Sequence, residues 1–160
     1  MTSTTSTTGT TRSVAHSTFV IERTLDAPVA RVWRAFADLD EKRAWFGAGE
    51  GWTKTEESDD LRVGGTAVDE GRFDGGTLSR YVATYTDVVE HERIVLTYDM
   101  WLDGAHISTS LATYELEADG EGTHLRYTEH GVHLDGLDSA AQREEGTRGL
   151  FDALAVHLGG

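Results

Sequence analysis

Hydrophobic and polar residues alternate along most of this chain in the pattern that is typical of β-strands. From residue 52 onward, segments rich in β-branched and aromatic residues are separated by short glycine-containing stretches. Ala112, Tyr114 and Leu116 fall on one side of such a segment, with polar residues between them, as in a sheet with one face in water. We predict strands at 17–25, 52–57, 66–73, 78–88, 93–101, 106–117 and 123–130.

The connections between these segments favour tight turns. The stretches 74–76, 103–104 and 119–122 are built from Asp and Gly with one Glu, and Asp and Gly adopt positive φ at little cost. Connections this short join neighbouring antiparallel strands. The strands from residue 52 onward are therefore predicted to form consecutive hairpins.

Two short helices are predicted between the first and second strands. Asp26 can accept hydrogen bonds from the free amides of the first helix, and Pro28 fits its first turn, where no N–H donor is needed. Asp40 is the expected cap of the second helix, which we expect to end in Trp45 and Phe46.

The last helix is predicted over residues 139–158. Gly146 and Gly149 lie in its interior, where each glycine costs about 1 kcal/mol relative to alanine. Two glycines therefore indicate a structural role that offsets this loss of helix stability. They either leave room for a cavity under the helix or allow a close approach of helix and sheet, and the sequence favours neither explanation. The apolar stripe of this helix is Gly146, Leu150, Leu154 and Leu158, with Thr147 and Phe151 beside it.

Each of these amphipathic elements must bury its apolar side against another. The order of elements predicts an α+β fold, in which a seven-stranded, curved antiparallel sheet wraps one long C-terminal helix. One domain is expected over residues 17–160. Residues 1–16 are rich in Thr and Ser and offer little apolar area to bury, so we predict a disordered tail there.

Composition narrows the list of partners. The formal net charge of −14 repels phosphate backbones and anionic lipid headgroups, so neither nucleic acid nor a membrane is an expected partner. The chain contains no cysteine, which excludes disulfides and thiolate nucleophiles. The tail lacks the apolar core of a secretion signal, and no apolar run approaches the length of a membrane span. We therefore expect a cytoplasmic protein.

A set of short motifs resembles one protein family. They are Asp26-Ala27-Pro28, Val32-Trp33, Trp45-Phe46, Asp60-Leu61-Arg62-Val63-Gly64-Gly65, Glu92-Arg93-Ile94-Val95, Gly122-Thr123-His124-Leu125 and Glu145-Gly146 with Leu150 and Leu154. In these motifs the chain resembles the family of homologues of the activator of heat-shock-protein-90 ATPase. That family lies in the START-like (SRPBCC) superfamily, which includes polyketide cyclases and lipid carriers. The resemblance covers residues 17–158 and implies a helix-grip fold. Family members commonly carry Trp after the glycine of the last helix, where this chain has Thr147.

Several polar residues continue the dry face of the sheet. His106 and Ser108 continue the alternation of the strand 106–117, and Glu129 shares a face with Leu125 and Tyr127. Buried polar groups need partners, which a ligand can supply, although His106 and Glu129 can equally lie at a solvated rim. The expected ligand-binding residues are Trp45, Trp52, Tyr81, Tyr98, Trp101, His106, Ser108, Glu129, Gly146, Thr147, Leu150 and Phe151.

Motifs for cofactors and metals are weak. The chain has neither a phosphate-binding loop nor a nucleophile elbow. His130 and His133 lie near Asp135, but outside a helix this spacing does not place two imidazoles on one ion. We therefore predict no cofactor and no metal.

Three functions fit these observations. The first is the binding of a hydrophobic or aromatic small molecule between the sheet and the last helix, without clear catalytic machinery. The second is an enzyme resembling polyketide cyclases and aromatases, with Glu129 or His106 moving protons. The third, implied by the resemblance, is regulation of a heat-shock chaperone ATPase. We rank it below ligand binding because eukaryotic activators carry an extra amino-terminal domain, where this sequence has a short tail.

Overall fold

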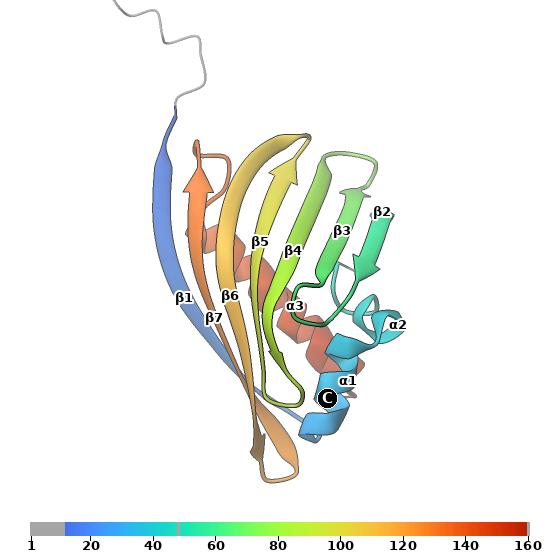
Figure 1. Cartoon of the computed structure of the whole chain (residues 1–160). Coiled ribbons are helices and arrows are strands. Elements are labelled where there is room, and N and C mark those ends of the chain that lie inside the picture. Colours follow the sequence, from blue (N-terminus) through green and yellow to red (C-terminus); the bar gives the residue numbers. More distant parts are fainter. Residues whose placement is uncertain (1–11, 48, 160) are drawn as a thin grey trace, which may run out of the picture.

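The computed structural model describes residues 12–47 and 49–159. These residues form seven strands and three helices (Figure 1). In chain order the elements are β1 (Val14–Leu25), α1 (Val29–Ala37), α2 (Leu39–Lys42), β2 (Trp52–Asp59), β3 (Thr66–Phe73), β4 (Leu78–Val89), β5 (Arg93–Leu102), β6 (Ala105–Asp119), β7 (Gly122–Leu134) and α3 (Ala140–His157).

The strands form one antiparallel sheet in the order β1-β7-β6-β5-β4-β3-β2. Strands β2 to β7 follow one another as hairpins, and β1 closes the other edge by pairing with β7. The sheet is curved, and α3 crosses one of its faces diagonally, while α1 and α2 pack near one end (Figure 1). The predicted α+β helix-grip fold is confirmed.

Alternation along the strands places the core on the face that α3 covers. Ala112, Tyr114 and Leu116 are buried, as their spacing predicts. The ring of Tyr114 packs against Phe36 of α1 at a centroid distance of 5.1 Å and against Phe151 of α3 at 6.2 Å. Aromatic contacts of this kind join both helices to the centre of the sheet.

The beginning of the chain differs from expectation at one point. Strand β1 starts at Val14, so residues 14–16, which were assigned to the tail, belong to the sheet and pair with residues 132–134. The side chain of Asp135 also accepts a hydrogen bond from the backbone N–H of Ser13 at 2.9 Å. The rest of the predicted tail, residues 1–11, lies outside the described part of the chain.

The two short helices begin differently from the prediction. Pro28, in an extended conformation, occupies the N-cap of α1, and no side chain bonds to the free amides there. Asp38 caps α2 and accepts a hydrogen bond from the backbone N–H of Asp40 at 2.9 Å. The expected caps Asp26 and Asp40 are therefore wrong. Because α2 follows α1 at once, the single residue between them ends one helix and begins the other.

The turn after α2 holds two residues that were expected inside the helix. Helix α2 ends at Lys42, so Trp45 and Phe46 follow it in a turn. Within the described ranges 12–47 and 49–159, none of the helices has the length and apolar character to cross a membrane.

Candidate functional site

A cavity of about 580 Å³ lies between the covered face of the sheet and α3. Strands β2 to β7, the turn after α2, the segment before α3 and the first half of α3 all contribute to its wall. Its volume falls in the range of small-molecule pockets, roughly 300–1,000 Å³. Six of the residues predicted to bind a ligand line it, namely Trp52, Tyr81, Tyr98, Gly146, Thr147 and Leu150.

The sheet supplies an aromatic wall. The rings of Tyr81 and Tyr98 lie 4.8 Å apart between centroids, and Phe46 meets Tyr81 edge-on at 5.2 Å. Leu96 and Met100, on the same face of β5 as Tyr98, add aliphatic surface. This side of the cavity suits a flat apolar molecule.

The helix side of the cavity includes Gly146. A Cβ atom built at Gly146 or at Gly149 would meet no atom within 4 Å, other than its own helix and chain neighbours. The two glycines therefore do not mark a close approach of helix and sheet. Both glycines are exposed, but Gly146 lines the cavity and Gly149 does not.

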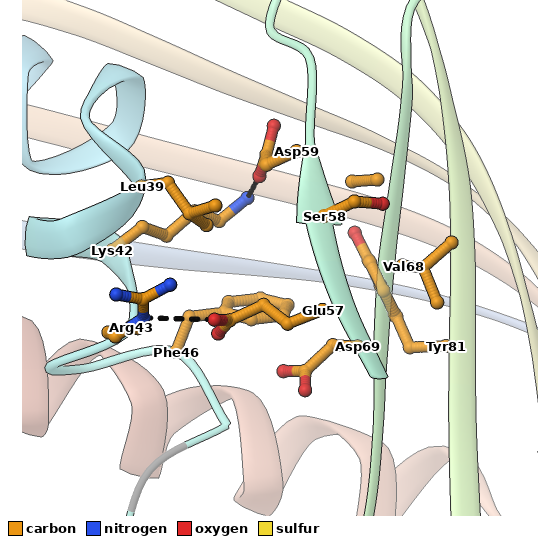
Figure 2. A pocket seen from close by; sticks show the side chains of 11 residues that line it. Leu39, Lys42, Arg43, Phe46, Glu57, Ser58, Asp59, Val68, Asp69 and Tyr81 are labelled. Carbon is orange, nitrogen blue, oxygen red and sulfur yellow. Dashed lines mark hydrogen bonds and ion pairs between the residues drawn. The ribbon is translucent and has the colours of Figure 1, made fainter. Parts of the chain in front are cut away.

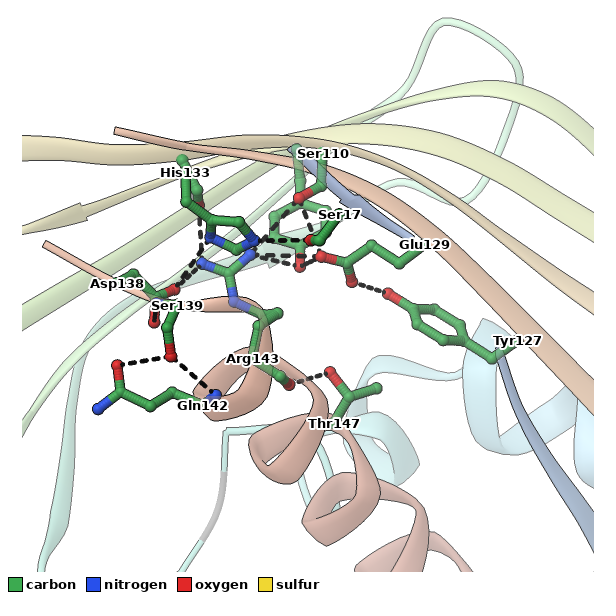
Figure 3. Close-up of polar contacts among 12 residues, drawn as sticks. Ser17, Ser110, Tyr127, Glu129, His133, Asp138, Ser139, Gln142, Arg143 and Thr147 are labelled. Carbon is green, nitrogen blue, oxygen red and sulfur yellow. Dashed lines mark hydrogen bonds and ion pairs between the residues drawn. The ribbon is translucent and has the colours of Figure 1, made fainter. Parts of the chain in front are cut away.

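One end of the cavity is closed by a buried polar network around Arg143 of α3 (Figure 3). The Arg143 guanidinium is 9% exposed. It donates hydrogen bonds to the hydroxyls of Tyr98 (2.9 Å) and Ser108 (2.7 Å) and to the carboxylate of Asp138 (2.6 Å). Burial disfavours its charge, but Tyr98, Glu129 and Asp138 outweigh that effect and raise the pKa of Arg143.

Glu129 lies at the centre of this network. Its carboxylate accepts hydrogen bonds from the hydroxyls of Tyr127 (2.5 Å), Tyr98 (2.8 Å) and Ser110 (2.9 Å), and Arg143 lies 3.4 Å away. Burial, and then the charge of Glu129, raise the pKa of Tyr98. A carboxylate with this many donors is a hydrogen-bonded anchor that holds the ring of Tyr98 at the cavity wall.

A serine and a histidine extend the network toward β1. Nε2 of His133 lies 3.1 Å from the hydroxyl of Ser17, and Nδ1 lies 3.8 Å from the carboxylate of Asp138. Burial, together with the charge of Arg143, lowers the pKa of His133, so the neutral imidazole is favoured. The separation of His133 and Asp138 exceeds hydrogen-bonding distance, so the three residues do not form a serine–histidine–aspartate relay.

A second, smaller pocket lies between α2 and strands β2 and β3, with five charged residues in its wall, and it shares Phe46, Asp69 and Tyr81 with the cavity (Figure 2). Lys42 forms an ion pair with Asp59 and also contacts the hydroxyl of Tyr85 at 3.2 Å. Lys54 pairs with Glu57 at 2.8 Å and lies 3.2 Å from the carboxylate of Asp69. Asp69 itself lines the cavity.

Two of the predicted aromatic residues belong to the core instead of the site. Trp45 is 1% exposed, and its indole N–H donates to the backbone carbonyl of Ala35 at 2.9 Å. Phe151 is fully buried against Tyr127, with ring centroids 5.3 Å apart. Both residues point toward α1 or the middle of the sheet, and neither lines the cavity.

A β-bulge places His106 on the face opposite to the predicted one, whereas Trp101 faces away from the cavity by ordinary alternation after Tyr98 and Met100. The pairing of β5 with β6 shifts between Met100 and Trp101, and Ile107 has no partner there. Ile107 therefore faces the cavity. His106 bonds to Asp99 (2.9 Å) on the other face of the sheet and stacks on Trp101. The cavity wall contains neither His106 nor Trp101.

Ser108 and Glu129 are buried, as the alternation predicts, but they lie behind the cavity wall. The cyclase hypothesis assigned proton transfer to Glu129 or His106. Neither side chain lines the cavity, so the geometry does not support these two roles. The sequence interpretation missed Arg143, Asp138 and Asp69, which are the charged residues that do line it.

Fold and cavity together define a helix-grip protein with an internal pocket. Residues 26–159 match the family model of activator of Hsp90 ATPase homolog 1-like proteins. The chain belongs to this family. No curated protein matches the chain.

Solved structures share the fold of this chain. A putative uncharacterized protein from Rhizobium leguminosarum is 40% identical, with a TM-score of 0.88 over 93% of this chain and 98% of that one. The Mll3558 protein from Rhizobium loti is 48% identical, with a TM-score of 0.84 over 91% and 99%. An AHSA1-like protein from Aeromonas hydrophila shares the fold, with 22% identity and a TM-score of 0.69 over 89% and 92%.

Proposed function

We propose that this protein binds a hydrophobic or aromatic small molecule in the cavity between the sheet and α3. The observation that carries the proposal is the cavity of about 580 Å³ with its wall of aromatic and aliphatic side chains. A wall of this kind gains free energy by removing an apolar ligand from water. The polar network around Arg143 holds Tyr98 and the start of α3 in place around it.

Two glycines of α3 offer a matched test. Gly146→Leu places a side chain on a residue that lines the cavity, whereas Gly149→Leu places it on a residue that does not. Both substitutions improve helix propensity by roughly the same amount, up to about 1 kcal/mol, so both variants are expected to fold. We expect Gly146→Leu to weaken ligand binding at least about tenfold, and Gly149→Leu to leave it unchanged.

The measurement is calorimetry and thermal shift with flavone, 2-methoxynaphthalene and dodecanol as probes. A ligand at about 100 times its Kd raises the free energy of unfolding by about 2.7 kcal/mol, which a thermal shift detects. Equal affinities of the two glycine variants, or no binding of any probe to the wild type, would contradict the proposal.

The description of the family suggests a second candidate, regulation of an Hsp90-type ATPase. The test is the ATPase rate of a purified Hsp90 with and without this protein. Stimulation that persists in Gly146→Leu would favour a regulatory surface outside the cavity, whereas no stimulation would leave ligand binding as the proposed function.

A further inference from the structure

Two polar atoms at the β2–β3 end of the cavity have no hydrogen-bond partner in the described part of the chain, although one of them lies in an ion pair with Lys54. The indole Nε1 of Trp52 and the carboxylate Oδ1 of Asp69 are buried and have no hydrogen-bond partner among the described residues. Both residues line the cavity, and Asp69 is only 9% exposed. A buried donor or acceptor without a hydrogen bond reduces the stability of the fold. The two atoms therefore point to a ligand that supplies the missing hydrogen bonds.

The backbone is shaped to bring these two side chains together. A Cβ atom at Gly71 would lie 2.7 Å from the indole of Trp52, so the indole lies across β3 at this glycine. Asp69 lies two residues before Gly71 on the same face of β3, about 7 Å away by strand geometry. Only a residue without a side chain at position 71 allows Trp52 this approach.

A second glycine makes room for the carboxylate. A Cβ atom at Gly47 would lie 2.0 Å from Oδ2 of Asp69, and Gly47 has a positive φ of 64°. A larger residue there would displace the carboxylate from the cavity wall. Figure 2 shows the Asp69 side chain pointing from β3 toward the turn that follows α2.

The charges around Asp69 favour a neutral ligand group. Lys54 forms an ion pair with Oδ1 at 3.2 Å and already places a positive charge beside this carboxylate. Burial raises the pKa of Asp69, with Lys54 opposing the effect. A cationic amine would meet the charge of Lys54, whereas a hydroxyl donates a hydrogen bond without adding charge.

We propose that the cavity recognises a hydroxylated apolar molecule, such as a phenol, whose oxygen accepts from Trp52 and whose hydrogen is donated to Asp69. This inference rests on the proposed function and specifies the polar group of its ligand. The aromatic wall of Tyr81 and Phe46, beside Asp69, holds the ring that carries the hydroxyl.

Three probes of similar shape test the hydrogen bonds to Trp52 and to Asp69 one at a time. Naphthalene has no oxygen, 2-methoxynaphthalene has an acceptor, and 2-naphthol has an acceptor and a donor. We expect wild-type affinity to rise about five- to tenfold at each step, because one net hydrogen bond is added each time. Calorimetry measures the three affinities.

Each step is assigned to one residue by substitution. Trp52→Phe keeps an aromatic ring but no N–H, and should abolish the gain from naphthalene to 2-methoxynaphthalene. Asp69→Val keeps a branched strand residue but no acceptor, and should abolish the gain from 2-methoxynaphthalene to 2-naphthol. Trp101→Phe, outside the cavity, should keep both gains.

An NMR signal provides a second readout. The indole N–H resonance of Trp52, assigned by its loss in Trp52→Phe, should shift downfield with 2-naphthol and stay in place with naphthalene. Equal binding of the three probes to the wild type and variants would overturn this inference and leave the proposed function standing. Binding of none of them would overturn both.

Discussion

At the scale of single residues, Arg143 changes how α3 is understood. The sequence pattern placed Gly146, Leu150, Leu154 and Leu158 on the inner stripe, but the buried residues are Arg143, Thr147, Phe151 and Leu154. The inner face is therefore rotated from the predicted one. Its first member is a charged residue that a hydrophobicity pattern assigns to solvent. Its burial is possible because hydroxyls and two carboxylates surround it.

Arg143→Met is expected to destabilise the fold by about 3 kcal/mol or more, because it leaves Glu129 and Asp138 without their cation. Arg148→Met on the same helix removes only an exposed pair with Glu144 and should cost less than about 0.5 kcal/mol. Urea unfolding measures both values.

The double variant Arg143→Met with Glu129→Gln should recover part of the loss, since it removes one of the uncompensated charges. If Arg143→Met costs no more than Arg148→Met, the buried network does not stabilise this end of the cavity.

The strand residues of the site that the sequence predicts correctly are those whose orientation follows from local alternation. Tyr81 and Tyr98 are examples, because they lie on regular stretches of β4 and β5. Asp69 was missed since a lone acid in a strand gives no sign of its surroundings. Arg143 could have been found, because it precedes the buried Thr147 by four residues, one turn of the helix.

At the scale of elements, the strands and α3 could be predicted closely because their signals are local. Asp103 and Gly104, for example, have φ of 48° and 85° in the turn between β5 and β6. The bulge at Met100 and Trp101 has no such signal, since it depends on the pairing of two strands. That bulge alone moved His106 to the opposite face.

Helices α1, α2 and α3 meet at one carboxylate. Glu41 of α2 accepts hydrogen bonds from Arg31 (2.6 Å) and Arg34 (2.9 Å) of α1 and lies 3.0 Å from Nε2 of His157 at the end of α3. The bond to His157, and then those to the two arginines, lower the pKa of Glu41 to about 2. This contact ties the short helices to the end of α3.

Glu41→Gln should therefore reduce stability in a pH-dependent manner. The pKa of Glu41 in the folded protein lies below its usual value of 4.5, so the contribution of Glu41 to stability is complete above about pH 4.5 and is lost as the pH falls toward 2. We expect a loss of about 1–2 kcal/mol at neutral pH, allowing for a side chain that is 20% exposed.

Urea unfolding at several pH values between about 7 and 3 tests this expectation. The difference between wild type and Glu41→Gln should shrink as the pH falls. Glu121→Gln, at an exposed turn, is the control and should stay within about 0.5 kcal/mol of wild type. A difference that is independent of pH would show that Glu41 acts through packing instead of charge.

At the scale of the whole molecule, the cavity lies inside a strongly acidic protein. The formal net charge is −14. The cations near the two ends of the cavity do not make its surroundings positive. Arg143 faces the carboxylates of Glu129 and Asp138, and Lys54 faces those of Glu57 and Asp69. Each of these two cations is thus already paired with carboxylates. The field of the whole molecule should disfavour an anionic ligand.

This effect can be measured by comparing the affinities of a neutral ester and of the corresponding carboxylate. We expect 2-naphthoate to bind at least about tenfold more weakly than methyl 2-naphthoate at about 10 mM salt, where the Debye length is about 30 Å. Near 0.1 M salt the Debye length falls to about 10 Å, so the acid should gain affinity while the ester does not. If the acid bound more tightly than the ester, or weakened as salt increased, the positive charge of Arg143 would prevail over the carboxylates beside it, and the cavity would select acids.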